Sequence, residues 1–175
     1  FRLFGHERVL VLNGGLPAWI AAGLETASSP EVPTPTLYTP RADRRGELLA
    51  DQDAVKAALS AGQTVADARP AGRFTGADKE PRAGMRSGHM PGASSVPLSS
   101  LIADNGEFLS PTQLQSLFAR IDTSGPIITT CGSGVTAAGL SLGLHEIGLQ
   151  SRVYDGSWSE WGRESSDTEV VTGED

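Results

Sequence analysis

The sequence is poor in the features that mark secreted, membrane and nucleic-acid-binding proteins. Its 175 residues include one cysteine, so no internal disulfide can form, and we expect a reducing compartment, the cytoplasm. There is no run of about 18 apolar residues, so no membrane span is predicted, and no signal-peptide pattern opens the chain. The 21 acidic residues outnumber the 14 Lys and Arg, and this net charge of −7 argues against nucleic acid as a partner.

Metal ligands are equally scarce. One cysteine and three scattered histidines, His6, His89 and His145, provide no pair at the spacing of a zinc site. We therefore expect neither a metal nor another cofactor.

Strand and helix patterns alternate along most of the chain. Apolar runs predict strands at residues 64–69, 126–130 and 151–155. Helices are predicted at 51–62, 110–118 and 135–147, with a last helical turn or two after residue 156, and a long Gly-, Pro- and Arg-rich loop is predicted from 70 to about 95. This alternation is typical of an α/β fold with a mostly parallel sheet.

One short pattern occurs twice. VLNGGLPAW (11–19) aligns with VYDGSWSEW (153–161): each has an apolar stretch, a glycine turn, and a tryptophan five residues after the first glycine. Four prolines between residues 30 and 40 predict an extended linker between the copies. We interpret the repeated pattern as a sign of two tandem domains, and we expect the chain to be the C-terminal part of a longer protein.

Three segments follow from this interpretation. Residues 1–25 would be the terminal strand (8–13) and helix of a truncated first domain, residues 26–45 an interdomain linker, and residues 46–175 the catalytic domain.

The single cysteine lies in the stretch TTCGSGVTAAG, residues 129–139, between a strand pattern and a helix pattern. The glycines at 132 and 134 let successive backbone N–H groups turn inward, and the positive end of the following helix points to the same place. Because such a loop stabilises an anion, Cys131 is predicted to have a lowered pKa and to be a nucleophile.

Two alternatives to this prediction stay open. A buried cysteine can pack as a small apolar residue without any reactivity. Phosphatases of the Cys-x5-Arg kind use a similar loop, but they need an arginine six residues after the cysteine to clamp phosphate. Ala137 occupies that position here, which argues against a phosphate substrate.

The cysteine loop and its neighbouring motifs resemble one known family. CGSGVTAAG, VYDGSWSEW after it and DARPAGRFTGADKEPRAGMRSGHMPGASSVP before it are similar to the catalytic C-terminal domain of the 3-mercaptopyruvate sulfurtransferases, which are rhodanese-like sulfurtransferases. The resemblance runs from about Asp51 to Arg163, and VLNGGLPAW resembles the end of the family's non-catalytic first domain. It implies a rhodanese-like domain whose sheet carries helices on both faces.

The resemblance also implies a reaction. Cys131 would take the sulfur of 3-mercaptopyruvate, release pyruvate, and pass the persulfide sulfur to a thiol such as thioredoxin or to cyanide. Ser133 would take part in proton transfer, and Arg73 and Arg82 would hold the carboxylate and keto group of the substrate. Backbone N–H groups of the remaining loop positions would stabilise the charged sulfur: Gly132, Gly134, Val135 and Thr136. The absent N-terminal rhodanese-like domain would line one side of the cleft.

Other residues near these motifs receive plainer predictions. From the residues alone, Arg69, Arg86 and the 41–45 cluster fit a carboxylate as well as the two family arginines do. The remaining expectations are that His89 bonds backbone and is not catalytic, that Asp67 caps or holds the loop after its strand, and that Trp158 and Trp161 belong to the core.

The neutral loop predicts the sulfur donor. Rhodaneses that prefer thiosulfate resemble one another in having basic residues where this chain has Gly132, Ser133 and Gly134. Without them the dianion loses charge-assisted contacts worth roughly 1.5–3 kcal/mol each. We therefore expect 3-mercaptopyruvate to be preferred, with thiosulfate as the alternative donor and a non-catalytic binding module as the alternative function.

Overall fold

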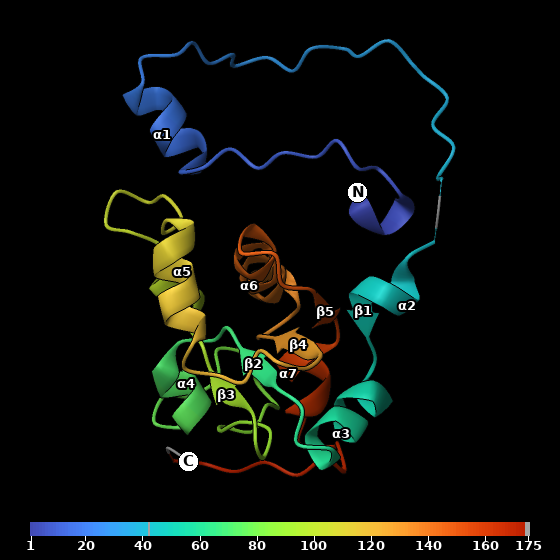
Figure 1. Cartoon of the computed structure of the whole chain (residues 1–175), viewed down its shortest axis with the longest axis vertical. Coiled ribbons are helices and arrows are strands. Elements are labelled where there is room, and N and C mark those ends of the chain that lie inside the picture. Colours follow the sequence, from blue (N-terminus) through green and yellow to red (C-terminus); the bar gives the residue numbers. More distant parts are fainter. Residues whose placement is uncertain (42, 174–175) are drawn as a thin grey trace.

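Five parallel strands form the centre of the molecule (Figure 1). The computed structural model describes residues 1–41 and 43–173. The sheet has the strand order β1-β5-β4-β2-β3, and each pair of neighbours runs parallel. Its strands are β1 (Leu49–Ala50), β2 (Val65–Asp67), β3 (Ser94–Ser95), β4 (Ile127–Thr130) and β5 (Ser151–Tyr154). The alternating sequence pattern correctly predicted a parallel sheet and the strands β2, β4 and β5, whereas β1 and β3 were not predicted.

Helices cover both faces of the sheet. The α-helices are α1 (Gly15–Ala21), α2 (Arg45–Leu48), α3 (Gln52–Ser60), α4 (Ala71–Thr75), α5 (Pro111–Phe118), α6 (Val135–Glu146) and α7 (Ser157–Trp161). Two short 3-10 helices are η1 (Arg2–Phe4) and η2 (Leu98–Leu101). Strand side chains alternate: Val65 and Ile128 pack with α3 and α7, whereas Ala66 and Ile127 pack with α5 and α6.

Local sequence signals set the ends of the long helices. The Asp51 side chain accepts the N–H of Ala54 and so caps α3. Ser110 and Gln113 form a reciprocal capping box at the start of α5, where Pro111 takes the first helical position. These helices begin where the sequence predicted, because each start depends only on residues within one turn.

The predicted loop from 70 to 95 is partly wrong. It contains the helix α4 and the edge strand β3. α4 has only five residues and includes Gly72, so it carries no helical periodicity that a sequence pattern could reveal. Its stability comes from tertiary packing, since Phe74 is buried in the core next to α3 and α7.

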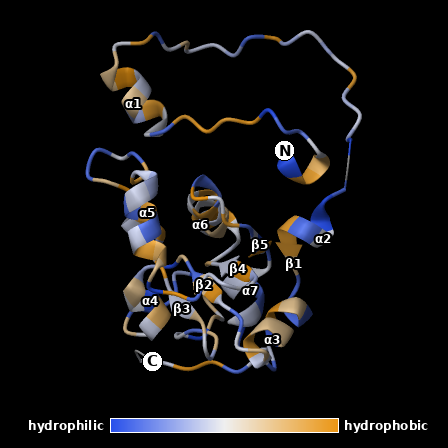
Figure 2. Ribbon diagram, viewed as in Figure 1, coloured by the Kyte–Doolittle hydropathy of each residue, from blue (hydrophilic) through white to orange (hydrophobic). Residues whose placement is uncertain are grey.

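The strand predicted at residues 8–13 is not formed. The segment is irregular, Leu10 is 97% exposed, and only the helix that follows, α1, is present as expected. Figure 2 shows this apolar stretch running apart from the sheet. No strand in residues 1–41 and 43–173 pairs with it, and a strand without a neighbour has no partner for its backbone N–H and C=O groups.

No described helix combines the length and the apolar character that crossing a bilayer would require.

Candidate functional site

Cys131 lies at the carboxyl end of β4, at the start of the cysteine loop (residues 131–136), which leads into α6. Only 2% of its surface is exposed. The carbonyl oxygens of Cys131 and Gly132 accept the N–H groups of Trp158 and Ser159, at 2.9 Å each. The carbonyl groups of the loop therefore face α7, and the predicted strand–loop–helix arrangement is confirmed.

The sulfur of Cys131 is surrounded by hydrogen-bond donors. Burial by itself raises the pKa of this thiol, because the charged form is poorly solvated. Hydrogen bonds from four groups lower it: the Thr136 hydroxyl, the N–H groups of Ser133 and Ala137, and, least, the Ser157 hydroxyl at 3.9 Å. Together they outweigh burial, and the pKa of Cys131 lies below its ordinary value. Cys131 is thus suited to be a nucleophile at lower pH than a free thiol.

Charged groups lie close to both loop glycines, and the backbone of Gly134 also has a conformation that favours glycine. Gly134 has φ +83°, and a Cβ there would lie 2.9 Å from Oδ1 of Asp155. A Cβ on Gly132 would lie 3.2 Å from Nη2 of Arg73. Any side chain at either position would therefore press on charged neighbours.

Arg73 is the arginine that lies against the cysteine loop. It projects from α4 and is clamped by Glu80, whose carboxylate accepts from Nε at 3.0 Å and from Nη2 at 2.5 Å. This pairing fixes the plane of the guanidinium and leaves Nη1 and one hydrogen of Nη2 for another acceptor. The prediction that Arg73 belongs to the site is consistent with this position.

Arg82 reaches the loop indirectly. It is exposed, and its Nη1 donates to Oγ of Ser159 at 2.5 Å. Ser159 Oγ in turn donates to the carbonyl of Gly132 at 2.6 Å. The structure therefore brings both family arginines to Gly132, one directly and one through a serine.

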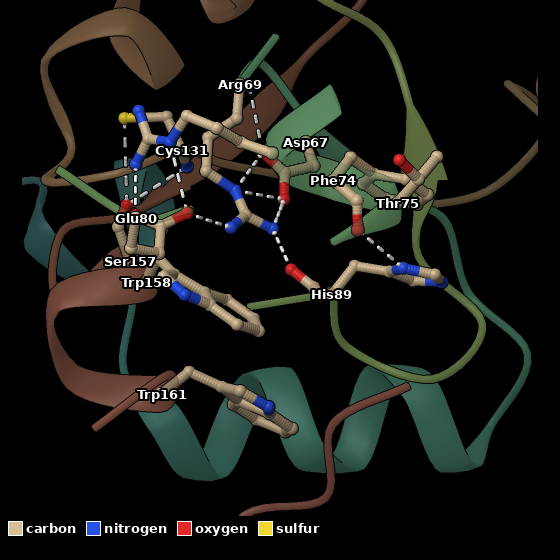
Figure 3. Close-up of polar contacts among 12 residues, drawn as sticks. Asp67, Arg69, Phe74, Thr75, Glu80, His89, Cys131, Ser157, Trp158 and Trp161 are labelled. Atoms are coloured by element: carbon tan, nitrogen blue, oxygen red, sulfur yellow. Dashed lines mark hydrogen bonds and ion pairs between the residues drawn. The ribbon is translucent and has the colours of Figure 1, made fainter. Parts of the chain in front are cut away.

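Asp67, Arg69 and Glu80 form a buried ionic network (Figure 3). Arg69 bonds the Asp67 carboxylate, the Glu80 carboxylate and the carbonyl of Gly88, and its guanidinium lies 4.0 Å from the Trp158 ring. Asp67 also accepts the N–H of Arg69, as predicted for a residue that holds the loop after β2. Because its hydrogen bonds are directed into this network, Arg69 supports the site and does not face the loop.

The remaining predicted site residues differ in their roles. Ser133 is exposed at the loop surface, and its N–H points to sulfur at 3.4 Å. The Val135 side chain is 77% exposed. The N–H of Gly134 does not serve the sulfur as expected, because it donates to Oγ of Ser157 at 3.0 Å.

Three residues of the site escaped sequence reasoning: Glu80, Ser157 and Ser159. Glu80 pairs with Arg73 and Arg69, and no spacing in the sequence marked either pair. The two serines lie in the VYDGSWSEW pattern, which gave no sign that its hydroxyl groups reach back to the cysteine.

The predicted backbone contact of His89 and the predicted core positions of Trp158 and Trp161 are confirmed. His89 is buried, its Nδ1 lies 2.9 Å from the carbonyl of Phe74, and the two rings stack at 3.8 Å. Trp158 and Trp161 are core residues. Within residues 1–41 and 43–173, no group of three or more His, Cys, Asp or Glu side chains is placed to hold a metal ion.

Comparison with known proteins gives a consistent result. A family model described as "Rhodanese-like domain" matches residues 51–164. Human 3-mercaptopyruvate sulfurtransferase is 35% identical over 98% of this chain, and chicken thiosulfate sulfurtransferase is 37% identical over 92% of this chain. The match covers 59% and 56% of those two proteins, so the chain spans less than two thirds of these relatives.

Solved structures show the same likeness. The Tum1 protein of Saccharomyces cerevisiae superposes with a TM-score of 0.85 and 26% identity, over 99% of this chain and 63% of Tum1. The sub-stoichiometric sulfur transferase subunit of yeast mitochondrial complex I is 39% identical, with a TM-score of 0.66, over 81% of this chain and 53% of the subunit.

Proposed function

Because the chain belongs to the rhodanese-like domain family, we propose that it is a sulfurtransferase that carries sulfur as a persulfide on Cys131. The observation that supports this most directly is the set of donors around Sγ, which lowers the pKa of a thiol that burial alone would raise. A thiolate is the form of cysteine that attacks sulfur.

The first step moves sulfur from the donor to Cys131. The thiolate attacks the thiol sulfur of 3-mercaptopyruvate, so an S–S bond forms while the C–S bond of the donor breaks. The electron pair of the broken bond stays on carbon as the enolate of pyruvate, which takes up a proton. The thiol hydrogen remains on the transferred sulfur.

The second step regenerates the thiolate. An acceptor thiolate attacks the outer sulfur of the persulfide, a new S–S bond forms on the acceptor, and Cys131 leaves as the thiolate. Thioredoxin is a suitable acceptor by its chemistry, and cyanide can take the sulfur as thiocyanate.

The residues around the loop divide the work of binding. Arg73 and Arg82 would hold the carboxylate and keto oxygen of the donor, since guanidinium groups bind planar oxyanions. Ser133, which is exposed and whose N–H points to Sγ, would supply a proton to the enolate. The N–H groups of Ser133 and Ala137 and the Thr136 hydroxyl would stabilise negative sulfur.

The charges at the loop favour 3-mercaptopyruvate as the donor. Gly132, Ser133 and Gly134 carry no cation, and Glu80 neutralises much of the charge of Arg73. A monoanionic carboxylate is therefore better matched than a dianion. Thiosulfate is the second candidate, because relatives named for it are as similar as those named for 3-mercaptopyruvate. The ratio of kcat/KM for the two donors decides, and a higher value with thiosulfate would reverse the order.

Persulfide formation tests the proposal itself. After treatment with 3-mercaptopyruvate and removal of the excess, intact-mass spectrometry should show one added sulfur atom. Cys131→Ser should gain none and should lose at least roughly a thousandfold in turnover, because the nucleophile is gone. An unmodified thiol after exposure to both donors would contradict a sulfurtransferase, and hydrolysis of an aryl phosphate by the same protein would indicate a phosphatase.

We also propose a location for the protein and a neighbouring domain. We infer a reducing cytoplasmic location from the single free thiol. An N-terminal rhodanese-like domain is the proposed neighbour of residues 1–25, and the exposed side chains of Leu10, Val11 and Leu12 support this.

A further inference from the structure

Ser157, the first residue of α7, binds the backbone of the cysteine loop at two points. It is completely buried beside Cys131 (Figure 3). Its Oγ accepts the N–H of Cys131 at 3.2 Å and the N–H of Gly134 at 3.0 Å. One hydroxyl from a distant segment therefore fixes the separation and orientation of the first and fourth residues of the loop.

The hydrogen-bonding capacity of this hydroxyl is fully used. A serine hydroxyl has one proton and two lone pairs. The lone pairs receive the two loop N–H groups, and the proton lies toward the carbonyl of Tyr154 at 2.7 Å. Sγ of Cys131 is farther away, at 3.9 Å. Its single proton is shared with the nearer Tyr154 carbonyl, so the hydroxyl is the weakest of the donors to Sγ and acts on the sulfur chiefly through the loop.

The backbone of Ser157 shows that the hydroxyl is the reason for a serine here. Its φ is +49°, and it is the one non-glycine residue with positive φ in the described parts of the chain. In the repeated sequence pattern the matching residue is Gly15, with φ +60°. Glycine adopts this conformation without steric cost, so the turn alone calls for glycine.

We propose that Ser157 is a positioning residue for the nucleophile: by binding the N–H groups of Cys131 and Gly134, its hydroxyl keeps the N–H of Ser133 directed at Sγ. The loop has two kinds of N–H group. The N–H of Ser133 points to the sulfur, whereas the N–H groups of Cys131 and Gly134 donate to Ser157. The bonds to Ser157 hold the loop backbone and so set the direction of the Ser133 N–H. The effect on turnover rests on the proposed sulfurtransferase function, whereas the effect on thiol reactivity does not.

Charged groups near the loop set the background for any test. Arg73 with its partner Glu80, Arg82, and Asp155 beside Gly134 are the charged side chains that face the loop from α4, from the segment after α4 and from the end of β5. None of them is altered when Ser157 is replaced. A change in the titration of the thiol is then due to the lost hydroxyl.

Alkylation of the thiol gives the direct test. The rate at which iodoacetamide modifies Cys131 is measured against pH for the unsubstituted protein, Ser157→Ala and Ser157→Gly. Since the chain has one cysteine, intact mass reports a single site. We expect the midpoint of the pH profile to rise by about one unit in both variants, which is roughly a tenfold slower reaction below the midpoint. The assay needs no sulfur donor, so its outcome is independent of the proposed function.

Glycine keeps the test valid where alanine disturbs folding, because it fits the positive φ. Ser141→Ala is the matched control: its hydroxyl bonds Thr129 and Ser151 under α6, away from the cysteine loop, so the midpoint should not move. A folded Ser157→Gly protein with an unchanged midpoint would overturn the proposal, as would an equal shift in Ser141→Ala. If the protein turns over donor, kcat should fall in Ser157→Gly while KM stays within about twofold.

Discussion

The sequence pattern that occurs twice in this chain gives two different structures. In residues 153–161 it forms the end of β5, a glycine turn and α7, and Tyr154 and Trp161 are core residues. In residues 11–19 it forms the helix α1 without a strand, and the matching Leu12 and Trp19 are exposed. The two copies share residue types but differ in their neighbours.

The difference separates local from non-local causes of structure. Both copies have a glycine turn and a short helix, because these depend on residues close in sequence. Only the second copy has a strand, because β4 and β1 lie on either side of it and complete its hydrogen bonds. Both tryptophans lie in a helix, but only Trp161, in the copy that has a strand, is buried. Burial therefore depends on the strand being formed.

The largest effect should come from the paired tryptophans. Trp161 is 3% exposed, and its Nε1 donates to the carbonyl of Glu169, whereas Trp19 is 37% exposed and makes an equivalent bond to Glu25. Trp161→Ala should lower the free energy of unfolding by about 3–5 kcal/mol. Trp19→Ala should lower it by less than about 1 kcal/mol.

Urea unfolding followed by circular dichroism measures both variants. The hydrogen bonds of the two indoles are alike, so the difference between the variants isolates the contribution of the core. Equal losses in both would mean that α1 is as firmly packed as α7, and the comparison would fail.

A smaller effect, with a pH dependence, should appear at Tyr154. Burial, followed by the hydrogen bond to Glu160 at 2.7 Å, raises the pKa of its hydroxyl far above the ordinary value. The unfolded chain loses this proton near pH 10 and the folded chain keeps it, so stability is present below about pH 10 and falls as pH rises. Tyr154→Phe should cost about 1–2 kcal/mol at neutral pH.

The same variant should make the alkaline fall in stability shallower by roughly 1.4 kcal/mol per pH unit, the value for one proton. Urea unfolding midpoints at a series of pH values from about 9 to about 11 measure the slope of stability against pH. An identical slope in both proteins would show that Tyr154 ionises as freely in the folded state as in the unfolded state.

The smallest effect is expected at Leu10 in the first copy. Its side chain is almost completely exposed, so Leu10→Thr should change the free energy of unfolding of this chain by less than about 0.5 kcal/mol. A loss above about 1 kcal/mol would mean that the segment packs in solution, which would weaken the contrast between the copies.

The sequence predicted the features that depend on neighbouring residues. The Ser110 cap, the apolar β4 and the glycines before α6 were enough to place those elements and the cysteine loop between two of them. Alternation of strands and helices was enough for a parallel sheet. In contrast, the 8–13 segment has the composition of a strand, and composition carries no information about whether a partner strand is present.

Contacts between distant segments account for what was missed at the site. Glu80 clamps Arg73 across a turn of irregular chain, and Ser157 reaches the cysteine loop from beyond α6 and β5. Neither residue belongs to a recognisable pattern of spacing, since the chain path that brings them to the loop is set by the whole sheet. The resemblance to a family identified the arginines but not the residues that hold them.

The hydrogen bonds from α7 to the loop carbonyls also provide a way to measure how often the loop opens. The amides of Trp158 and Ser159 can exchange with solvent only when their bonds to Cys131 and Gly132 break. Hydrogen exchange at these two amides therefore reports how often the loop opens. The lifetime of the arrangement around the sulfur can therefore be followed from two amides of α7.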